Sequence, residues 1–196
     1  DDEAVARLLA AEAAGGKVGP WDLRVLRSAA ARRRGGSGAR GWALALAFGD
    51  ARREAEGLLA ADLARSPSDP HALLGRATLL RLERKAAEAI AAARAIWDAR
   101  PPIAIAASAA ELIADEEASR ARWEEAASWY RRAAIPMSPS TARCGYEGGR
   151  LLAEKLHRPE EARELFTEAC KAQNPKACER IGERPRPRLF PRRRGP

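Results

Sequence analysis

Cysteines are the residues whose spacing most directly suggests chemistry in this sequence, which contains Cys144, Cys170 and Cys178. Cys170 closes one predicted helix and Cys178 opens the next, with only KAQNPKA between them. So short a turn between antiparallel helices brings two Cα atoms within bridging distance, about 4.4–6.8 Å. The spacing therefore predicts a Cys170–Cys178 disulfide. The alternative is that both are reduced side chains packed as small apolar residues.

Cys144 lacks an equivalent partner. It lies 34 residues before Cys178, and the position that would pair with it in the same way holds Ala134. We expect a buried small residue, with a free thiol for an intermolecular bond as the alternative. No CxxC pair is present, and His71 and His157 are the only histidines. No metal site is predicted.

No residue pattern predicts catalysis or a bound cofactor. His71 lies at a predicted helix start and His157 in a loop, so neither is placed as a general base. The carboxylate pairs Glu124–Glu125 and Glu160–Glu161 precede helices, where acidic side chains interact favourably with the helix dipole. The glycine-rich stretch at Gly35 lacks the GxxxxGK[ST] pattern of a phosphate-binding loop. We predict a protein that is not an enzyme, and an enzyme with an unrecognised site is the remote alternative.

The segment Arg184–Pro196, here called the C-terminal arm, holds six arginines, four prolines and no acidic residue. Prolines at this spacing exclude a helix and favour an extended polyproline conformation. Arginines seek anions, so the arm is expected to bind an acidic groove of a protein partner. A disordered, solubilising tail is the alternative. The expected contact residues are Arg186, Arg188, Leu189, Phe190, Arg192, Arg193 and Arg194.

Most of the formal net charge of +8 belongs to this arm, and 8 − 6 leaves +2 for the rest of the chain. A polyanion is therefore the alternative partner, such as an acidic cell-envelope polymer or a membrane surface, with Arg32–Arg34 contributing. Nucleic acid is disfavoured, because nucleic-acid-binding domains carry a basic face.

The elements that position these residues repeat along the chain. Four segments carry small or apolar residues at i, i+3, i+4 and i+7 or i+8, which is one face of a helix. They align on alanines spaced by 34, 37 and 36 residues, namely Ala55, Ala89, Ala126 and Ala162. Each segment follows another predicted helix, and these first helices span 41–48, 70–82, 103–116 and 142–156. The pattern predicts an all-α chain of helix hairpins, with Trp97, Trp123 and Trp129 in the core between repeats.

The period and three positions resemble tetratricopeptide repeats. Ala77, Ala89 and Pro101 stand where that family has its small residue, alanine and closing proline. The run PEEARELFTEACKAQNPKACERIG, Pro159–Gly182, is similar to the Sel-one-like repeat. The resemblance implies a right-handed α-solenoid of about four antiparallel hairpins plus N-terminal helices. Its secreted, cysteine-rich branch also implies the Cys170–Cys178 pairing.

A solenoid of this kind has a concave groove lined by the first helix of each hairpin. By helical register, the expected groove residues are Arg40, Leu44, Phe48, His71, Leu74, Thr78 and Arg81. The function expected is that of a non-catalytic scaffold or accessory subunit, which binds other proteins of a larger complex.

Three segments are predicted: N-terminal helices with a basic, glycine-rich loop over 1–36, repeats over 37–183 and the arm over 184–196. No apolar run reaches the roughly 18 residues of a membrane helix. The acidic start, Asp1–Glu3, has no methionine and is compatible with a cleaved signal peptide. We therefore expect an extracytoplasmic bacterial protein, periplasmic or secreted, and a cytoplasmic location is the alternative.

Overall fold

The structure, a computed structural model, describes residues 52–136, 138 and 140–183. This part of the chain is all-helical, as predicted, and no strand lies within it. Its helices are α4 (Arg52–Arg65), α5 (Pro70–Leu82), α6 (Ala86–Asp98), α7 (Ile103–Ser119), α8 (Trp123–Ala133), α9 (Thr141–Glu154), α10 (Pro159–Lys171) and α11 (Pro175–Arg180). Segment 1–36, the predicted helix 41–48 and the C-terminal arm lie outside the described residues.

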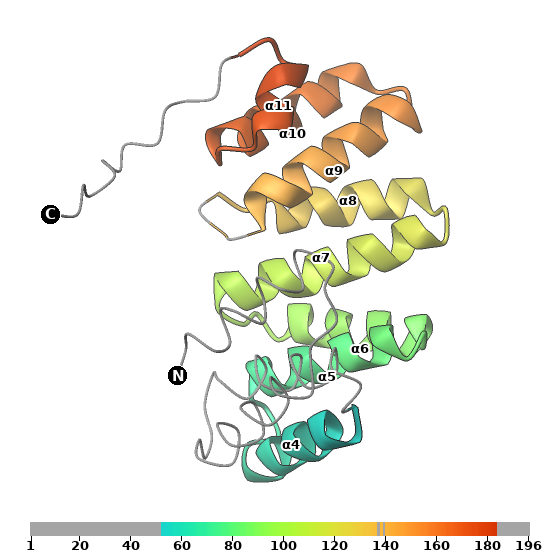
Figure 1. The fold of residues 1–196 in the computed structure, drawn as a ribbon, viewed down its shortest axis with the longest axis vertical. Coiled ribbons are helices and arrows are strands. Elements are labelled where there is room, and N and C mark those ends of the chain that lie inside the picture. The colour runs from blue at the N-terminus through green and yellow to red at the C-terminus, as the bar shows by residue number, and fades with distance from the viewer. Residues whose placement is uncertain (1–51, 137, 139, 184–196) are drawn as a thin grey trace, which may run out of the picture.

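The helices stack in chain order along the long axis, from α4 at one end to α11 at the other (Figure 1). Each helix packs against the next one in the chain, and α5 also packs against α7. Alanine makes this close packing possible. The four alanines that align the sequence segments are almost completely buried, with exposed fractions of 0 % for Ala55, Ala89 and Ala126 and 1 % for Ala162.

One turn geometry recurs between α5 and α6, between α7 and α8, and between α9 and α10. Each turn has one residue in the left-handed region, Arg84, Ala121 or His157, with φ of 60°, 57° and 54°. The residue that follows is basic in all three turns and is the N-cap of the second helix. A left-handed conformation costs an L-residue roughly 1–2 kcal/mol. Its recurrence without glycine indicates that the packing of the neighbouring helices imposes it, and Arg100 and Gln173, in the turns after α6 and α10, also have positive φ.

Helix α9 approaches its neighbours more closely than a side chain would allow. A Cβ atom added at Gly145 would lie 2.9 Å from the carbonyl oxygen of Leu165 in α10. At Gly148 it would lie 2.8 Å from Cβ of Tyr130 in α8, and at Gly149 2.7 Å from the ring of Phe166. These glycines let α9 sit directly on both neighbouring helices.

Candidate interaction surface

Charged side chains connect alternate helices of the stack, α5, α7, α9 and α11. Arg81 of α5 reaches across to α7, where its Nη1 lies 3.2 Å from Asp115 and its Nε 3.3 Å from Glu116. Helix α7 carries Glu111 and Asp115 one turn apart on the same side, which is why residues from two helices can meet there.

Arg143 of α9 approaches the same carboxylates from the other side. Its Nη1 donates to Glu111 at 2.5 Å and its Nη2 to Asp115 at 2.9 Å. The hydroxyl of Tyr130 donates to Asp115 at 2.7 Å, and that of Ser140 donates to Glu111 at 2.5 Å. Asp115 is thus held by three side chains from α5, α8 and α9.

The pKa values in this cluster follow from burial and from the two carboxylates. Burial raises the pKa of Tyr130 far above its usual range, and the charge of Asp115 adds to the shift. Desolvation acts to lower the pKa of Arg143, but Asp115 and Glu111 outweigh it and the pKa rises. Both side chains therefore keep their protons at neutral pH and act as hydrogen-bond donors.

The row of charges continues along α9 to α11. Arg150 Nη2 lies 2.8 Å from Glu147 and its Nη1 3.8 Å from Glu154. Arg180 of α11 pairs with the same Glu154 at 2.7 Å. We call Arg81, Arg143, Arg150 and Arg180 the arginine ladder.

The arginine ladder exposes its cations more than most of its anions. Its four side chains are 40–49 % exposed, whereas Asp115, Glu116 and Glu111 are 11 %, 13 % and 24 % exposed. A guanidinium has five N–H donors, and the carboxylates beneath it occupy only some of them. The ladder therefore offers pre-oriented donors to an acceptor from outside the chain.

The predicted groove residues of α5 have different environments. Arg81 belongs to the arginine ladder, and His71 and Thr78 are half-buried. The Thr78 hydroxyl donates to the carbonyl oxygen of Leu74 at 2.8 Å. Leu74, which was predicted to line a binding groove, is completely buried in this fold. Because α5 packs against α4, α6 and α7, its buried face is wider than register alone suggests.

Several predicted site residues cannot be placed. Arg40, Leu44 and Phe48 lie outside the described residues, as do the residues proposed for the arm. In contrast, sequence reasoning missed Glu111, Asp115 and Arg143. Two carboxylates four residues apart on α7 were the available signal, but nothing local showed that arginines from α5 and α9 converge on them.

The second helices carry aromatic rings covered by cations. Trp129 of α8 is in the core and meets Trp97 of α6 edge-on, with ring centroids 5.6 Å apart. The guanidinium of Arg132 lies 4.5 Å from the Trp129 ring centroid and that of Arg94 5.9 Å from it. Trp97 and Trp123 are partly buried against the same core.

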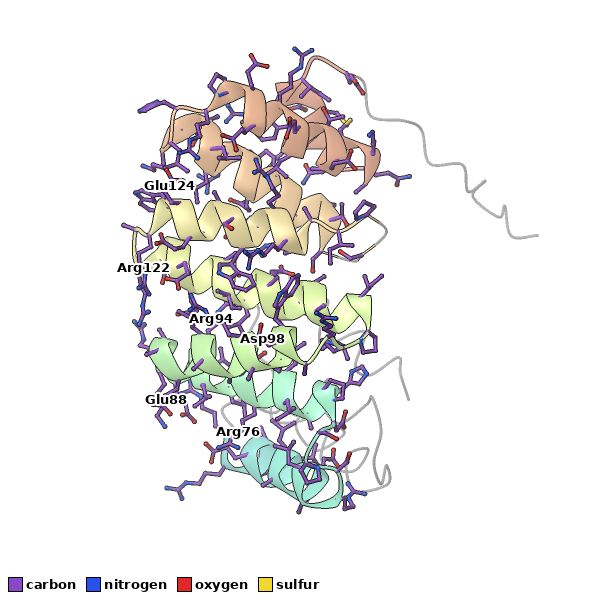
Figure 2. All side chains as sticks on the ribbon, turned by 180° about the vertical axis from the view of Figure 1, so that it is seen from behind. Arg76, Glu88, Arg94, Asp98, Arg122 and Glu124 are labelled. Atoms are coloured by element: carbon purple, nitrogen blue, oxygen red, sulfur yellow. A yellow bond between two sulfur atoms is a disulfide. The ribbon has the colours of Figure 1, made fainter. Side chains whose placement is uncertain are left out.

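Glu117, at the end of α7, is a buried carboxylate with only 2 % of its side chain exposed. Arg122 Nε lies 2.5 Å from its Oε2, and Arg94 Nη2 lies 3.5 Å from its Oε1. Oε2 has no hydrogen bond of good geometry, so the contact with Arg122 is an ion pair. Figure 2 shows Arg94 and Arg122 toward the same edge of the stack. This charge therefore ties α6 to the α7–α8 turn.

The sulfur atoms of Cys170 and Cys178 are 2.04 Å apart, at disulfide distance, and their Cα atoms are 4.7 Å apart, as predicted. Cys144 is buried and unpaired. Burial raises the pKa of its thiol, and the charge of Glu111 adds to the shift, so the thiol stays protonated at neutral pH.

Among the residues that the structure describes, no three His, Cys, Asp or Glu side chains are grouped to hold a metal ion.

A cavity of about 420 Å³ opens between α4, α5 and the start of α6. Leucines form its floor, and Glu56, Arg76, Glu83, Lys85 and Glu88 stand around it. Lys85 lies 2.8 Å from Glu83 and holds the pKa of that carboxyl below its usual range.

None of the described helices is long and apolar enough to cross a membrane.

Comparison with known proteins yields no match to a family model, to a curated protein or to a solved structure.

Proposed function

We propose that this chain is a non-catalytic scaffold or accessory subunit, built as a right-handed solenoid of tetratricopeptide-like and Sel-one-like hairpins. The recurrence of the turn at Arg84, Ala121 and His157, at intervals of 37 and 36 residues, supports the repeat. Repeat arrays present extended surfaces because each unit contacts only its neighbours.

The arginine ladder is the binding surface, and it is the observation that carries the proposal. Four half-exposed guanidinium groups lie on α5, α9 and α11, each already oriented by carboxylates. A partner that presents acidic side chains gains charge-assisted hydrogen bonds without having to order these arginines. The partner class is thus a protein with an acidic segment, within a larger complex.

The test compares two pairs of substitutions that remove the same charge. A partner that co-purifies with the chain is identified by mass spectrometry and then titrated against purified variants. Arg81→Gln with Arg180→Gln should weaken binding at least about tenfold, which corresponds to about 1.4 kcal/mol. Glutamine keeps a hydrogen-bond donor for the neighbouring carboxylates, so the fold is retained.

The matched control is Arg131→Gln with Arg163→Gln, which removes two exposed arginines from the second helices α8 and α10. Circular dichroism verifies that both double variants keep their helix content. If the partner no longer binds the control variant but still binds the ladder variant, the arginine ladder is not the binding surface.

Binding of a polyanion is the alternative, and it depends on residues outside the described part of the chain. Residues 52–183 contain 21 basic and 21 acidic side chains and are neutral, so the excess charge lies elsewhere. Salt titration distinguishes the two functions, because the affinity for a phosphate-like polyanion falls steeply as the salt concentration rises. Deleting Arg184–Pro196 should abolish polyanion binding but leave ladder-dependent binding.

An extracytoplasmic location forms part of the proposal. The Cys170–Cys178 pair supports it, because disulfides persist in oxidising compartments such as the bacterial periplasm.

A further inference from the structure

Glu154, the last residue of α9, is the most exposed of the carboxylates that pair with the arginine ladder. Its side chain is 40 % exposed, whereas the other carboxylates of the ladder are at most 28 % exposed. Its Oε1 lies 2.7 Å from Nη2 of Arg180 in α11, and its Oε2 lies 3.8 Å from Nη1 of Arg150 in α9. One carboxylate can therefore be held between α9 and α11, with one oxygen facing each guanidinium group.

Both arginines also have a contact that does not involve Glu154. Glu147 accepts hydrogen bonds from Nη2 of Arg150 at 2.8 Å and from its Nε at 3.2 Å. The guanidinium of Arg180 lies 5.9 Å from the ring centroid of Phe166, within the range of a cation–π interaction. These contacts keep the two guanidinium groups oriented when Glu154 turns out into solvent. The helix dipole favours that movement, because it disfavours a negative charge at the carboxyl end of α9.

The other two arginines of the ladder are placed differently. Arg81 and Arg143 pair with carboxylates of α7 that are only 11–24 % exposed. Carboxylates covered to this extent are held by the surrounding helices and have little room to turn away. The α9–α11 end is thus the part of the ladder where a carboxylate from outside can take the place of an internal one.

We propose that an acidic side chain of the partner binds between Arg150 and Arg180, in the place of Glu154, and that Glu154 is an internal competitor that limits the affinity. The inference rests on the proposed function, because it requires that the arginine ladder binds an acidic protein segment. Guanidinium groups that Glu147 and Phe166 already orient lose little conformational freedom on binding, and each donates a charge-assisted hydrogen bond. The ligand group is thus the carboxylate of an aspartate or glutamate.

A similar arrangement on α8 and α10 provides a matched control. Glu161 is also 40 % exposed, and it lies 2.7 Å from Arg131 and 3.8 Å from Arg158. Within the part of the chain that the structure describes, Arg131 has no other partner to orient it. If Glu161 turned away, Arg131 would be free to move, so these two arginines do not form a pre-oriented pair.

The dissociation constant of a capped oligoglutamate peptide, measured on the whole chain at low salt, tests the inference. Glu154→Gln should bind the peptide at least about threefold more tightly than the wild type, because the competing charge is removed. Adding Arg150→Gln to Glu154→Gln should abolish this gain. Glu161→Gln changes the net charge by the same amount and should leave the affinity close to that of the wild type. The C-terminal arm is present in every variant, so its contribution is the same throughout the comparison.

Two results would overturn the inference. One is an equal gain in Glu161→Gln and Glu154→Gln, which would mean that net charge alone determines the affinity. The other is a Glu154→Gln protein that binds no more tightly than the wild type. If Arg81→Gln with Arg180→Gln still weakens peptide binding in that second case, the proposed function stands and only the role of Glu154 is lost. If that double variant also has no effect, the proposed function fails as well.

Discussion

Asp115 is a carboxylate with only 11 % of its side chain exposed, and three donors surround it. Removing a charge from water is costly unless it is paired and hydrogen-bonded. Arg81, Tyr130 and Arg143 meet this requirement from three different helices. At the scale of the residue, the cluster thus serves to fix the relative placement of α5, α7, α8 and α9.

Two glycines in different surroundings, Gly145 in α9 and Gly57 in α4, give a matched pair of substitutions. Gly145→Ala should destabilise the protein by about 1–3 kcal/mol, because the new Cβ meets a backbone oxygen that has little room to move. Gly57→Ala in α4, where nothing lies within 4 Å, should stabilise it by about 0.5–1 kcal/mol through helix propensity. Urea unfolding measures both, and a stabilising Gly145→Ala would contradict the close approach of α9 to α10.

Helix α11 illustrates how an element is held by its context. Six residues are too few for a stable isolated helix. Asn174 caps it by accepting from the N–H of Ala177 at 3.1 Å, and its side-chain amide donates to the carbonyl oxygen of Ala142 at 2.7 Å. The Cys170–Cys178 link then ties the helix to α10.

Thiol counting checks this link. Without reductant, the folded chain should label no cysteine, and the denatured chain should label one, Cys144, because it is buried and unpaired in the fold. Denaturation with reductant should expose all three cysteines. Replacing both Cys170 and Cys178 by serine should cost on the order of 2–3 kcal/mol. Three labelled thiols in the denatured, unreduced chain would show that the pair is not oxidised.

The whole molecule is a stack in which contacts run between neighbouring helices (Figure 1). Stability in such an arrangement is approximately a sum of local units and the interfaces between them. A destabilising substitution at one end should therefore lower protection from hydrogen exchange mainly at that end. In a single globular core, the same substitution would lower protection in every helix.

Two substitutions that shorten a buried side chain, one toward each end of the stack, test this expectation by hydrogen exchange. Phe166→Ala should cost about 3–5 kcal/mol and reduce protection in α9, α10 and α11 more than in α5 and α6. Ile90→Ala in α6 should show the opposite pattern, since Ile90 is buried at the other end of the core. Uniform loss across all helices in both variants would indicate one cooperative core and count against the repeat array.

The all-helical class could be predicted from the sequence because helix signals are local. The 3.6-residue apolar pattern, the prolines at helix starts and the small residues at the aligned positions all act within one turn or one hairpin. The predicted helix starts at Pro70 and Ile103 coincide with the observed ones, and the predicted start at residue 142 lies one residue after the observed start of α9. The Cys170–Cys178 pairing was predictable for the same reason, because one short turn determines the distance.

Arg81 was predicted as a contact residue, but the arginine ladder as a whole was not predictable, because it depends on how helices that are distant in sequence pack together. Arg81 of α5 meets Asp115 of α7, 34 residues away, and Arg143 meets it from α9. Register alone placed Leu74 in a groove, but packing against three helices buries it. The sequence by itself determined the all-helical class and the cysteine pair. The tertiary structure decided which charges meet and which apolar side chains are covered, since both depend on how successive helices are oriented.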